Sequence, residues 1–298
     1  MKLKNLSKKI FNSGKIITFN GKNLKYVKKN KNKLIELFKE NGVLVFKDLE
    51  IEANQFKDLT DIFSATYAND AARREKTKFH PKINSVDIGN NEMSLHSEAS
   101  FSPSWPEILW FYCLEAPKKN GETTLCDGLK LWQSFTNQIK DYFLRNPLKF
   151  SLSIPIMKPK KSNEKKNWPL NNIGSFNSFL NYKTGNLEFD QIKFAVTESR
   201  LSNDLCFSNH VMYKDTDETI KKWGTISNKK IPSKIIKYIE KQADKLKVFY
   251  KWKKNEIIML DNRRFLHGRN FFSKNEKRKI INIQTLKANF SYEHIKNI

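Results

Sequence analysis

The chain has 298 residues, of which 39% are hydrophobic, and its 22 Phe, 9 Tyr and 6 Trp can fill a sizeable core, which excludes an intrinsically disordered polymer. The formal net charge of +24 points at first to nucleic acid or an acidic membrane surface. Only 8 of the 55 basic residues are Arg, however, and scattered lysines lack the guanidinium forks that phosphate recognition recruits. We therefore expect a solvated basic surface and no nucleic-acid partner, with a polyanion or an acidic protein as the alternative.

The N-terminal half is predicted to mix short strands with helices. Residues 1 to about 30 form a basic extension that carries a short strand at 15–19. The spacing of apolar residues predicts helices over 31–40, 51–64 and 130–145, and aliphatic or aromatic runs predict strands over 43–46, 108–114 and 122–125.

The C-terminal half begins with a polar, Lys/Asn-rich segment at about 158–172, which we predict to be a flexible loop. A helix over 232–246 and strands over 247–251, 256–260 and 279–286 follow. Many short strands with a few outer helices predict a mainly β fold with flanking helices (α+β), whose core is a double-stranded β-helix, the jelly roll of cupin-like proteins. We expect residues 1–298 to form a single domain.

A candidate metal site begins at the triplet His96-Ser97-Glu98. On a strand, residues i and i+2 project from the same face, so the imidazole of His96 and the carboxylate of Glu98 can converge on one ion. His267 follows a predicted strand, lies in a polar turn and is the natural third ligand. Two His and one carboxylate form the facial triad of non-haem Fe(II) oxygenases, and a surface His beside a solvated Glu is the alternative.

A polar row runs along the predicted strand 279–286. Arg278, Ile280, Asn282 and Gln284 share one face by the strand period of two, and the opposite face is aliphatic. If the row faces inward, the guanidinium of Arg278 offers bidentate binding to a carboxylate. The other polar side chains of the row either contact a substrate or serve hydrogen bonds inside the barrel.

The sequence resembles the taurine dioxygenase superfamily of Fe(II)/2-oxoglutarate enzymes, and within it the branch related to syringomycin-biosynthesis hydroxylases. The resemblance covers most of the chain and rests on three blocks in the order of that family: SLHSEASFSPSWPEILWFYCLEAP, NGETTLCDG and IIMLDNRRFLHGRNFFSKNEKRKIINIQ. It implies the jelly-roll fold, with Fe(II) as cofactor and 2-oxoglutarate and O2 as co-substrates. It also implies iron ligation by His96, Glu98 and His267.

The same resemblance implies that Arg278 binds the distal carboxylate of 2-oxoglutarate together with the hydroxyl of Thr123, which is otherwise an ordinary strand Thr. The metal carboxylate is Glu98 where the family more often has Asp, and a halogenase would have a small residue there. Asn282 stands where taurine-specific enzymes have a second Arg, so taurine is not the expected substrate. Phe101, Asn282 and His210 are the expected substrate contacts, although a core residue is the favoured interpretation of His210.

We therefore predict a dioxygenase that hydroxylates an unactivated C–H bond of a small organic acid or of an amino acid, free or tethered to a carrier protein, with succinate and CO2 as co-products. Desaturation and cyclisation use the same chemistry and stay open. The alternatives are a non-enzymatic, basic nucleic-acid-binding or interaction protein and a degenerate oxygenase kept only for interactions.

Three cysteines without CxxC spacing indicate neither a disulfide framework nor a zinc knuckle, and they fit a reducing cytoplasm. The basic N-terminus lacks the continuous apolar stretch of a secretory signal, so we expect no export and no membrane insertion. A small-molecule substrate is the expected partner, an acidic carrier protein could present it on the basic surface, and a homo-oligomer is compatible with the sequence.

Overall fold

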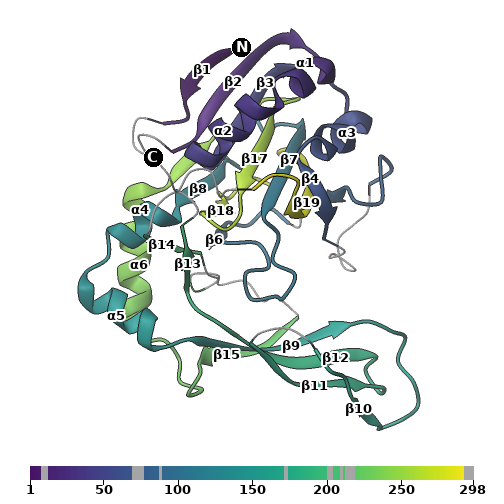
Figure 1. Ribbon diagram of the computed structural model, residues 1–298, viewed down its shortest axis with the longest axis vertical. Coiled ribbons are helices and arrows are strands. Elements are labelled where there is room, and N and C mark those ends of the chain that lie inside the picture. Colours follow the sequence, from purple (N-terminus) through teal and green to yellow (C-terminus); the bar gives the residue numbers. More distant parts are fainter. Residues whose placement is uncertain are drawn as a thin grey trace.

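The computed structural model describes residues 1–7, 13–68, 77–86, 89–170, 174–199, 204–208, 211 and 219–291. Their largest sheet has the strand order β1-β2-β3-β17-β7-β19-β4, with β5 paired to β19 (Figure 1). Among the described strands, only β2 and β3 pair in parallel. The bounds are β1 Lys2–Asn5, β2 Lys15–Lys22, β3 Val43–Leu49, β17 Ile257–Asp261, β7 Ile108–Glu115, β19 Lys279–Ala288, β4 Ser64–Tyr67 and β5 Asn84–Ser85.

A four-stranded sheet with the order β16-β8-β18-β6 faces this main sheet. Its strands are β16 Val248–Tyr250, β8 Thr123–Asp127, β18 Phe265–Arg269 and β6 Met93–His96. A hydrophobic core between the two sheets joins Leu109 and Phe111 of the main sheet to Leu125 and Phe265 of the second. Two mainly antiparallel sheets packed in this way form the predicted jelly roll, and the mainly β fold with flanking helices is confirmed.

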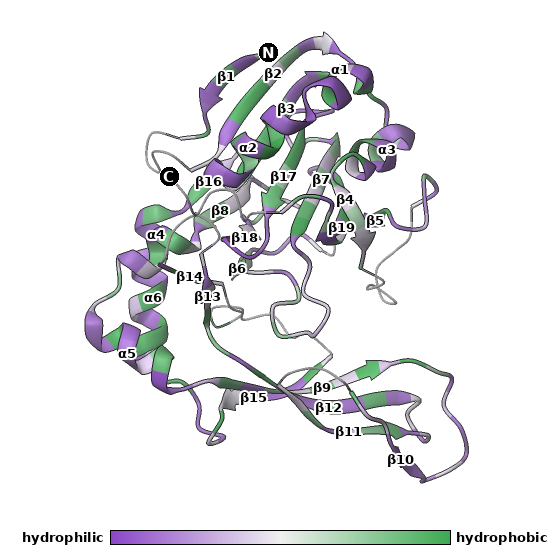
Figure 2. Cartoon of the chain, viewed as in Figure 1, coloured by the Kyte–Doolittle hydropathy of each residue, from purple (hydrophilic) through white to green (hydrophobic). Residues whose placement is uncertain are grey.

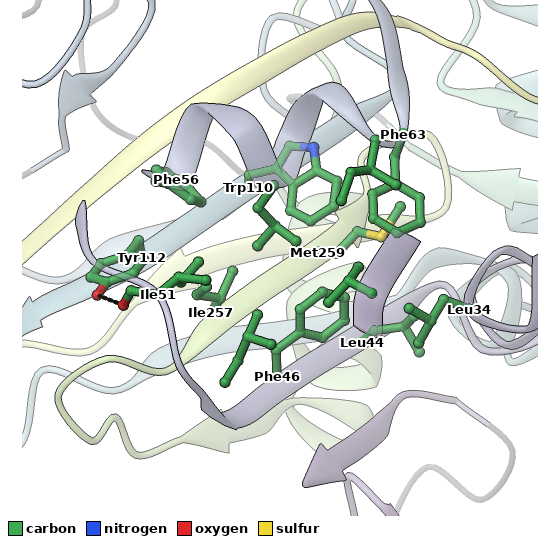
Figure 3. Close-up of a cluster of buried hydrophobic side chains, with 14 of the residues drawn as sticks. Leu34, Leu44, Phe46, Ile51, Phe56, Phe63, Trp110, Tyr112, Ile257 and Met259 are labelled. Atoms are coloured by element: carbon green, nitrogen blue, oxygen red, sulfur yellow. Dashed lines mark hydrogen bonds between the residues drawn. The ribbon is translucent and has the colours of Figure 1, made fainter. Parts of the chain in front are cut away.

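Helices cover the other face of the main sheet. They are α1 Leu24–Lys29, α2 Lys31–Asn41, the short 3-10 helix Ala53–Gln55 and α3 Phe56–Asp61. Strand β7 is buried on both faces. Trp110 and Tyr112 pack toward these helices (Figure 3), while Leu109 and Phe111 belong to the core inside the jelly roll. In keeping with this double burial, β7 and β17 are largely hydrophobic in Figure 2. The core is therefore layered as helices, main sheet and second sheet.

An outer layer lies beyond the second sheet and includes a five-stranded sheet in the order β10-β11-β12-β9-β15, seen at the bottom of Figure 1. Its strands are β10 Lys165–Asn167, β11 Ser175–Asn181, β12 Asn186–Lys193, β9 Leu148–Pro155 and β15 Ile220–Thr225, and β13 Val196–Glu198 pairs with β14 Leu205–Phe207. Helices α4 Gly128–Gln133, α5 Asn137–Arg145 and α6 Ser233–Leu246 accompany them. Apolar side chains such as Phe150 and Phe207 join this layer to Leu266 of β18.

The structure differs from the predicted elements in several places. The helix expected over 130–145 is two helices, because the hydroxyl of Ser134 donates to the carbonyl of Leu131 and helps to close α4. The helix expected over 51–64 is only a 3-10 turn followed by α3, and Ser64 already begins β4. Within the expected loop 158–172, residues 165–167 form β10, which pairs with β11. Residues 171–172 lie outside the described residues.

The first thirty residues, expected to be a basic extension, add β1, β2 and α1 to the body of the fold. Ile17 and Phe19 of β2 are fully buried in the core beneath the helices. This burial explains why β2 is hydrogen-bonded to β3 instead of trailing in solvent. Within the described ranges, no helix is long and apolar enough to cross a membrane.

Candidate metal and co-substrate site

Three donor side chains converge at the β6 edge of the second sheet. His96 ends β6, His267 lies in the middle of β18, and the two are cross-strand partners. Each imidazole Nε2 lies 3.9 Å from Oε2 of Glu98, and the ring centroids of the two histidines are 4.4 Å apart. All three ligand atoms fall within 4.8 Å of one another. Both histidines are buried, and Glu98 is partly exposed.

Hydrogen bonding prepares His96 to offer its Nε2 atom. Its Nδ1 atom lies 2.9 Å from the backbone carbonyl of Ser94. Because a carbonyl oxygen can only accept, this contact requires the proton on Nδ1 and leaves the lone pair on Nε2. The ring of Phe111 packs 5.6 Å from that of His267 and fixes the second imidazole from the side of the main sheet.

Glu98 reaches the site through a turn and not along a strand, which corrects the reasoning from strand periodicity. Strand β6 ends at His96, and Ala99 has a φ of 52°, in the left-handed region. The fully buried side chain of Asn262 holds this turn: its Oδ1 accepts from the Glu98 N–H at 2.9 Å, and its Nδ2 donates to the Glu98 carbonyl at 2.9 Å. Asn262 thus fixes both backbone groups of Glu98.

Gly268 allows β6 and β18 to approach closely beside the histidines. A Cβ atom at this position would lie 2.4 Å from the Met93 carbonyl oxygen and 2.7 Å from Oγ1 of Thr124. The first of these atoms is backbone and cannot move without shifting β6. The residue after His267 must therefore be glycine for His96 and His267 to face each other.

A buried ion pair anchors the start of β18. Arg264 donates to Asp127 at 2.6 Å, Ser13 donates to the same carboxylate at 2.6 Å, and Arg264 also donates to the Glu40 carbonyl at 2.9 Å. Burial alone would lower the pKa of Arg264, but attraction to Asp127, the hydrogen bonds with it and attraction to Asp261 together raise the pKa. The guanidinium remains charged and ties β18 to β8 and to the N-terminal segment.

Arg278 and Thr123 lie together at the other end of β8. The guanidinium Nε of Arg278 donates to the Gly121 carbonyl at 2.9 Å, and Nη2 donates to the Thr123 hydroxyl at 3.4 Å. The indole Nε1 of Trp252 donates to the same hydroxyl at 2.8 Å. These side chains are all at least nine-tenths buried, so a positive charge and a hydroxyl share an enclosed corner between the two sheets.

The polar row on β19 faces the interior of the jelly roll. Asn282 lies opposite Phe111, and Gln284 lies opposite Leu109. Both amides are buried, and in the described structure Oδ1 of Asn282 and both amide atoms of Gln284 have no hydrogen-bond partner. Unpaired buried amides each carry a desolvation cost of about 1–3 kcal/mol, which a ligand would relieve.

The other expected substrate contacts have different positions. Phe101 is buried in the cluster that joins the second sheet to the outer layer, with its ring 6.0 Å from that of Phe150. His210 lies outside the described residues. Sequence reasoning missed Asn262 and Trp252, which act through backbone groups and through another side chain, so no motif of ligand residues could reveal them.

The sequence matches the profile of the taurine catabolism dioxygenase TauD, TfdA family over residues 4–284, and the chain belongs to this family. It is 26% identical over 119 residues to the dapdiamide synthesis protein DdaC of Enterobacter agglomerans, a match that covers 39% of this chain and 36% of that protein.

Solved structures with low sequence identity share the fold. PvcB from Pseudomonas aeruginosa superposes with a TM-score of 0.59 at 12% identity, covering 92% of this chain and 86% of that one. AAD-2 in complex with Mn(II) and N-oxalylglycine gives 0.61 at 13% identity, with coverages of 98% and 100%. A taurine dioxygenase from Burkholderia xenovorans gives 0.60 at 11% identity, with coverages of 95% and 88%.

The chain therefore belongs to a family of non-haem Fe(II)- and 2-oxoglutarate-dependent dioxygenases. The converging donor set fits this cofactor, because two imidazoles and a carboxylate form the facial triad that such iron sites use. The family decides against the alternative of a non-enzymatic basic binding protein.

Proposed function

We propose that His96, Glu98 and His267 ligate Fe(II), and that the enzyme hydroxylates an unactivated C–H bond. In the balanced reaction, substrate R–H, 2-oxoglutarate and O2 give R–OH, succinate and CO2. The convergence of the three donor atoms within 4.8 Å carries this proposal. Iron and 2-oxoglutarate supply the activation of O2 when bound, and the residues of the chain bind, orient and exclude water.

Arg278 and Thr123 bind the distal carboxylate of 2-oxoglutarate in this proposal. A buried guanidinium beside a hydroxyl suits a carboxylate, because charge-assisted hydrogen bonds are strong where water is excluded. Glu98 keeps a carboxylate at the metal, where a small residue would open a position for halide. This supports hydroxylation over halogenation.

On the substrate side, we assign contacts to Phe101, Asn282 and His210. Asn282 presents an unpaired amide oxygen and Gln284 an amide with both atoms unpaired in the described structure, and these groups are neutral. Neutral amides favour an uncharged hydrogen-bonding group of the substrate over a sulfonate. This supports an amino acid or a small organic acid as the substrate, with its charged groups bound away from these amides. DdaC and PvcB belong to synthetic pathways by their names, which supports a biosynthetic substrate.

We also propose that an acidic carrier protein presents that substrate to the enzyme. The net charge of +24 would attract such a carrier. We place the enzyme in the cytoplasm, in keeping with its three cysteines, which are buried and form no disulfide.

An anaerobic titration with Fe(II) and 2-oxoglutarate tests the metal and co-substrate assignments through the weak visible charge-transfer band of the chelate. We expect the band in the wild type, its loss in His96→Ala, and a much higher 2-oxoglutarate requirement in Arg278→Ala. His80→Ala is the control, because His80 accepts from the Lys82 backbone outside the triad and should not affect the band. A normal band in His96→Ala would refute the ligand assignment.

Substrate screening follows with O2-dependent succinate release and a gain of one oxygen atom in the product mass. Free amino acids, the same amino acids tethered to a carrier protein and small organic acids form the three panels. If none of the three supports succinate release above the uncoupled rate, the proposed substrate class is wrong.

A further inference from the structure

Trp252 makes two contacts that matter for the Thr123 hydroxyl. It follows β16, is 3% exposed, and packs its ring edge against Tyr250 with the centroids 5.2 Å apart. Tyr250 is itself held by a hydrogen bond of 2.7 Å to Glu256 and is the cross-strand partner of Thr123. The indole therefore has a fixed place from which its Nε1 reaches Thr123 at 2.8 Å.

The direction of the hydrogen bonds at Thr123 follows from the donors around it. An indole N–H and a guanidinium N–H can only donate, so the Thr123 oxygen accepts from both Trp252 and Arg278. A hydroxyl oxygen has two lone pairs and one proton. With both lone pairs engaged, the proton must point in the remaining direction, and no acceptor for it is found among the described residues.

We propose that Trp252 is a positioning residue that makes Thr123 an obligate hydrogen-bond donor to the distal carboxylate of 2-oxoglutarate. The inference rests on the proposed co-substrate role of Thr123 and Arg278. Without the indole N–H, the hydroxyl is free to rotate, and part of its preorganisation for a carboxylate acceptor is lost. Trp252 itself does not touch the co-substrate in this arrangement.

The proposal predicts that the loss of Trp252 weakens only the binding of the distal carboxylate of 2-oxoglutarate. Trp252→Phe should raise the dissociation constant of 2-oxoglutarate about 3- to 10-fold, the size expected for one neutral hydrogen bond. Fe(II) binding without co-substrate should not change. Binding of 2-oxobutyrate, which keeps the keto acid but lacks the distal carboxylate, should not change either. Trp132→Phe is the matched control, because Trp132 is equally buried but belongs to a different cluster.

The decisive experiment is a double-mutant cycle with Thr123→Val, measured anaerobically by calorimetry and by the visible band of the Fe(II) complex. If Trp252 acts through Thr123, Trp252→Phe should have no further effect on 2-oxoglutarate affinity in the Thr123→Val background. An equal loss in both backgrounds, an equal loss for 2-oxobutyrate, or a change below about 1.5-fold in the wild-type background would overturn the proposal.

A shape-preserving replacement keeps the test valid if Trp252→Phe unfolds. β-(3-Benzothienyl)alanine at position 252 retains the size of the indole and removes only its N–H donor. It should reproduce the selective loss of 2-oxoglutarate affinity with an unchanged melting temperature. A wild-type protein that binds Fe(II) but no 2-oxoglutarate would instead refute the proposed co-substrate site itself, and the inference with it.

Discussion

The side chain of Asn262 is hydrogen-bonded to both the N–H and the C=O of Glu98, across 164 residues of sequence. Its Nδ2 also donates to the Pro106 carbonyl at 3.0 Å. The position of the only carboxylate in the candidate metal group is thus determined by a neutral amide from the turn that precedes β18.

Replacing this amide should affect stability and metal binding together. Asn262→Ala removes the three hydrogen bonds to Glu98 and Pro106 and a longer one from the Ser97 hydroxyl, and should lower the free energy of unfolding by about 3–4 kcal/mol, at roughly 1 kcal/mol for each bond. Fe(II) affinity should fall as well, because the Glu98 turn is released. Urea denaturation and Fe(II) titration measure the two effects. Asn41→Ala is the control, since that buried side chain donates only to the Leu37 carbonyl; a loss of Fe(II) affinity there would contradict the explanation.

Gly268→Ala should separate β6 from β18. The added Cβ would overlap the Met93 carbonyl oxygen, so the strands must move apart and the His96 and His267 side chains with them. We expect weaker Fe(II) binding in the fraction that still folds. Gly224→Ala introduces a similar overlap, with the Lys229 carbonyl at 2.8 Å, in the hairpin that ends β15. It should lower the melting temperature but leave Fe(II) affinity per folded molecule as in the wild type.

Breaking the Arg264–Asp127 pair should be costly. Asp127→Asn leaves the buried guanidinium without its paired carboxylate, and such changes cost about 3–5 kcal/mol. The double variant Asp127→Leu/Arg264→Met should recover part of this loss, because no charge remains to be buried. Denaturant unfolding of the single and double variants measures both free energies of unfolding and tests this expectation. Asp61→Asn, which breaks the exposed pair with Lys57, should change the unfolding free energy by less than about 1 kcal/mol.

Cys206 should be unreactive in the folded protein. Burial, followed by the nearby negative charge of Asp127, raises the pKa of its thiol from 9.0 to about 12. Iodoacetamide at pH 8 should therefore modify Cys206 only after unfolding, which peptide mass mapping can measure.

The same shift has a consequence for stability at alkaline pH. The folded state favours the neutral thiol of Cys206. Its contribution to the free energy of unfolding is therefore fully present below pH 9.0, the ordinary pKa, and is lost as the pH rises toward 12. The urea midpoint of the wild type should fall between pH 9 and 11 more steeply than that of Cys206→Ala. Parallel declines in the two proteins would exclude a linkage through this thiol.

The parts of the fold that could be predicted from the sequence are the segments whose own residue pattern determines their secondary structure. The apolar run of β7, the stripe of α6 and the alternation of β19 were each predicted within about two residues of the observed bounds. The candidate metal group could be predicted for a similar reason: His96 and Glu98 are close in sequence, and histidines are scarce.

What the sequence could not show depends on contacts between distant segments. Burial of Ile17 and Phe19 draws β2 into the main sheet, although the segment reads as a basic extension. The break between α4 and α5 depends on a local side-chain hydrogen bond that apolar spacing does not report. Trp252 and Thr123 are separated by 129 residues, so their pairing becomes visible only after the sheets are assembled.

Strand β18 contributes to both halves of the site through one ladder. His267 pairs with His96 on one side of it, and on the other side Arg269 pairs with Thr123. Inserting or deleting one residue between 265 and 269 would turn His267 to the opposite face of the sheet and shift Thr123 against its neighbours at the same time. Among related enzymes, we therefore expect the length of the outer five-stranded sheet to vary and the number of residues in β18 to stay constant. A change of length in β18 would remove iron binding and co-substrate binding together, in a single evolutionary event.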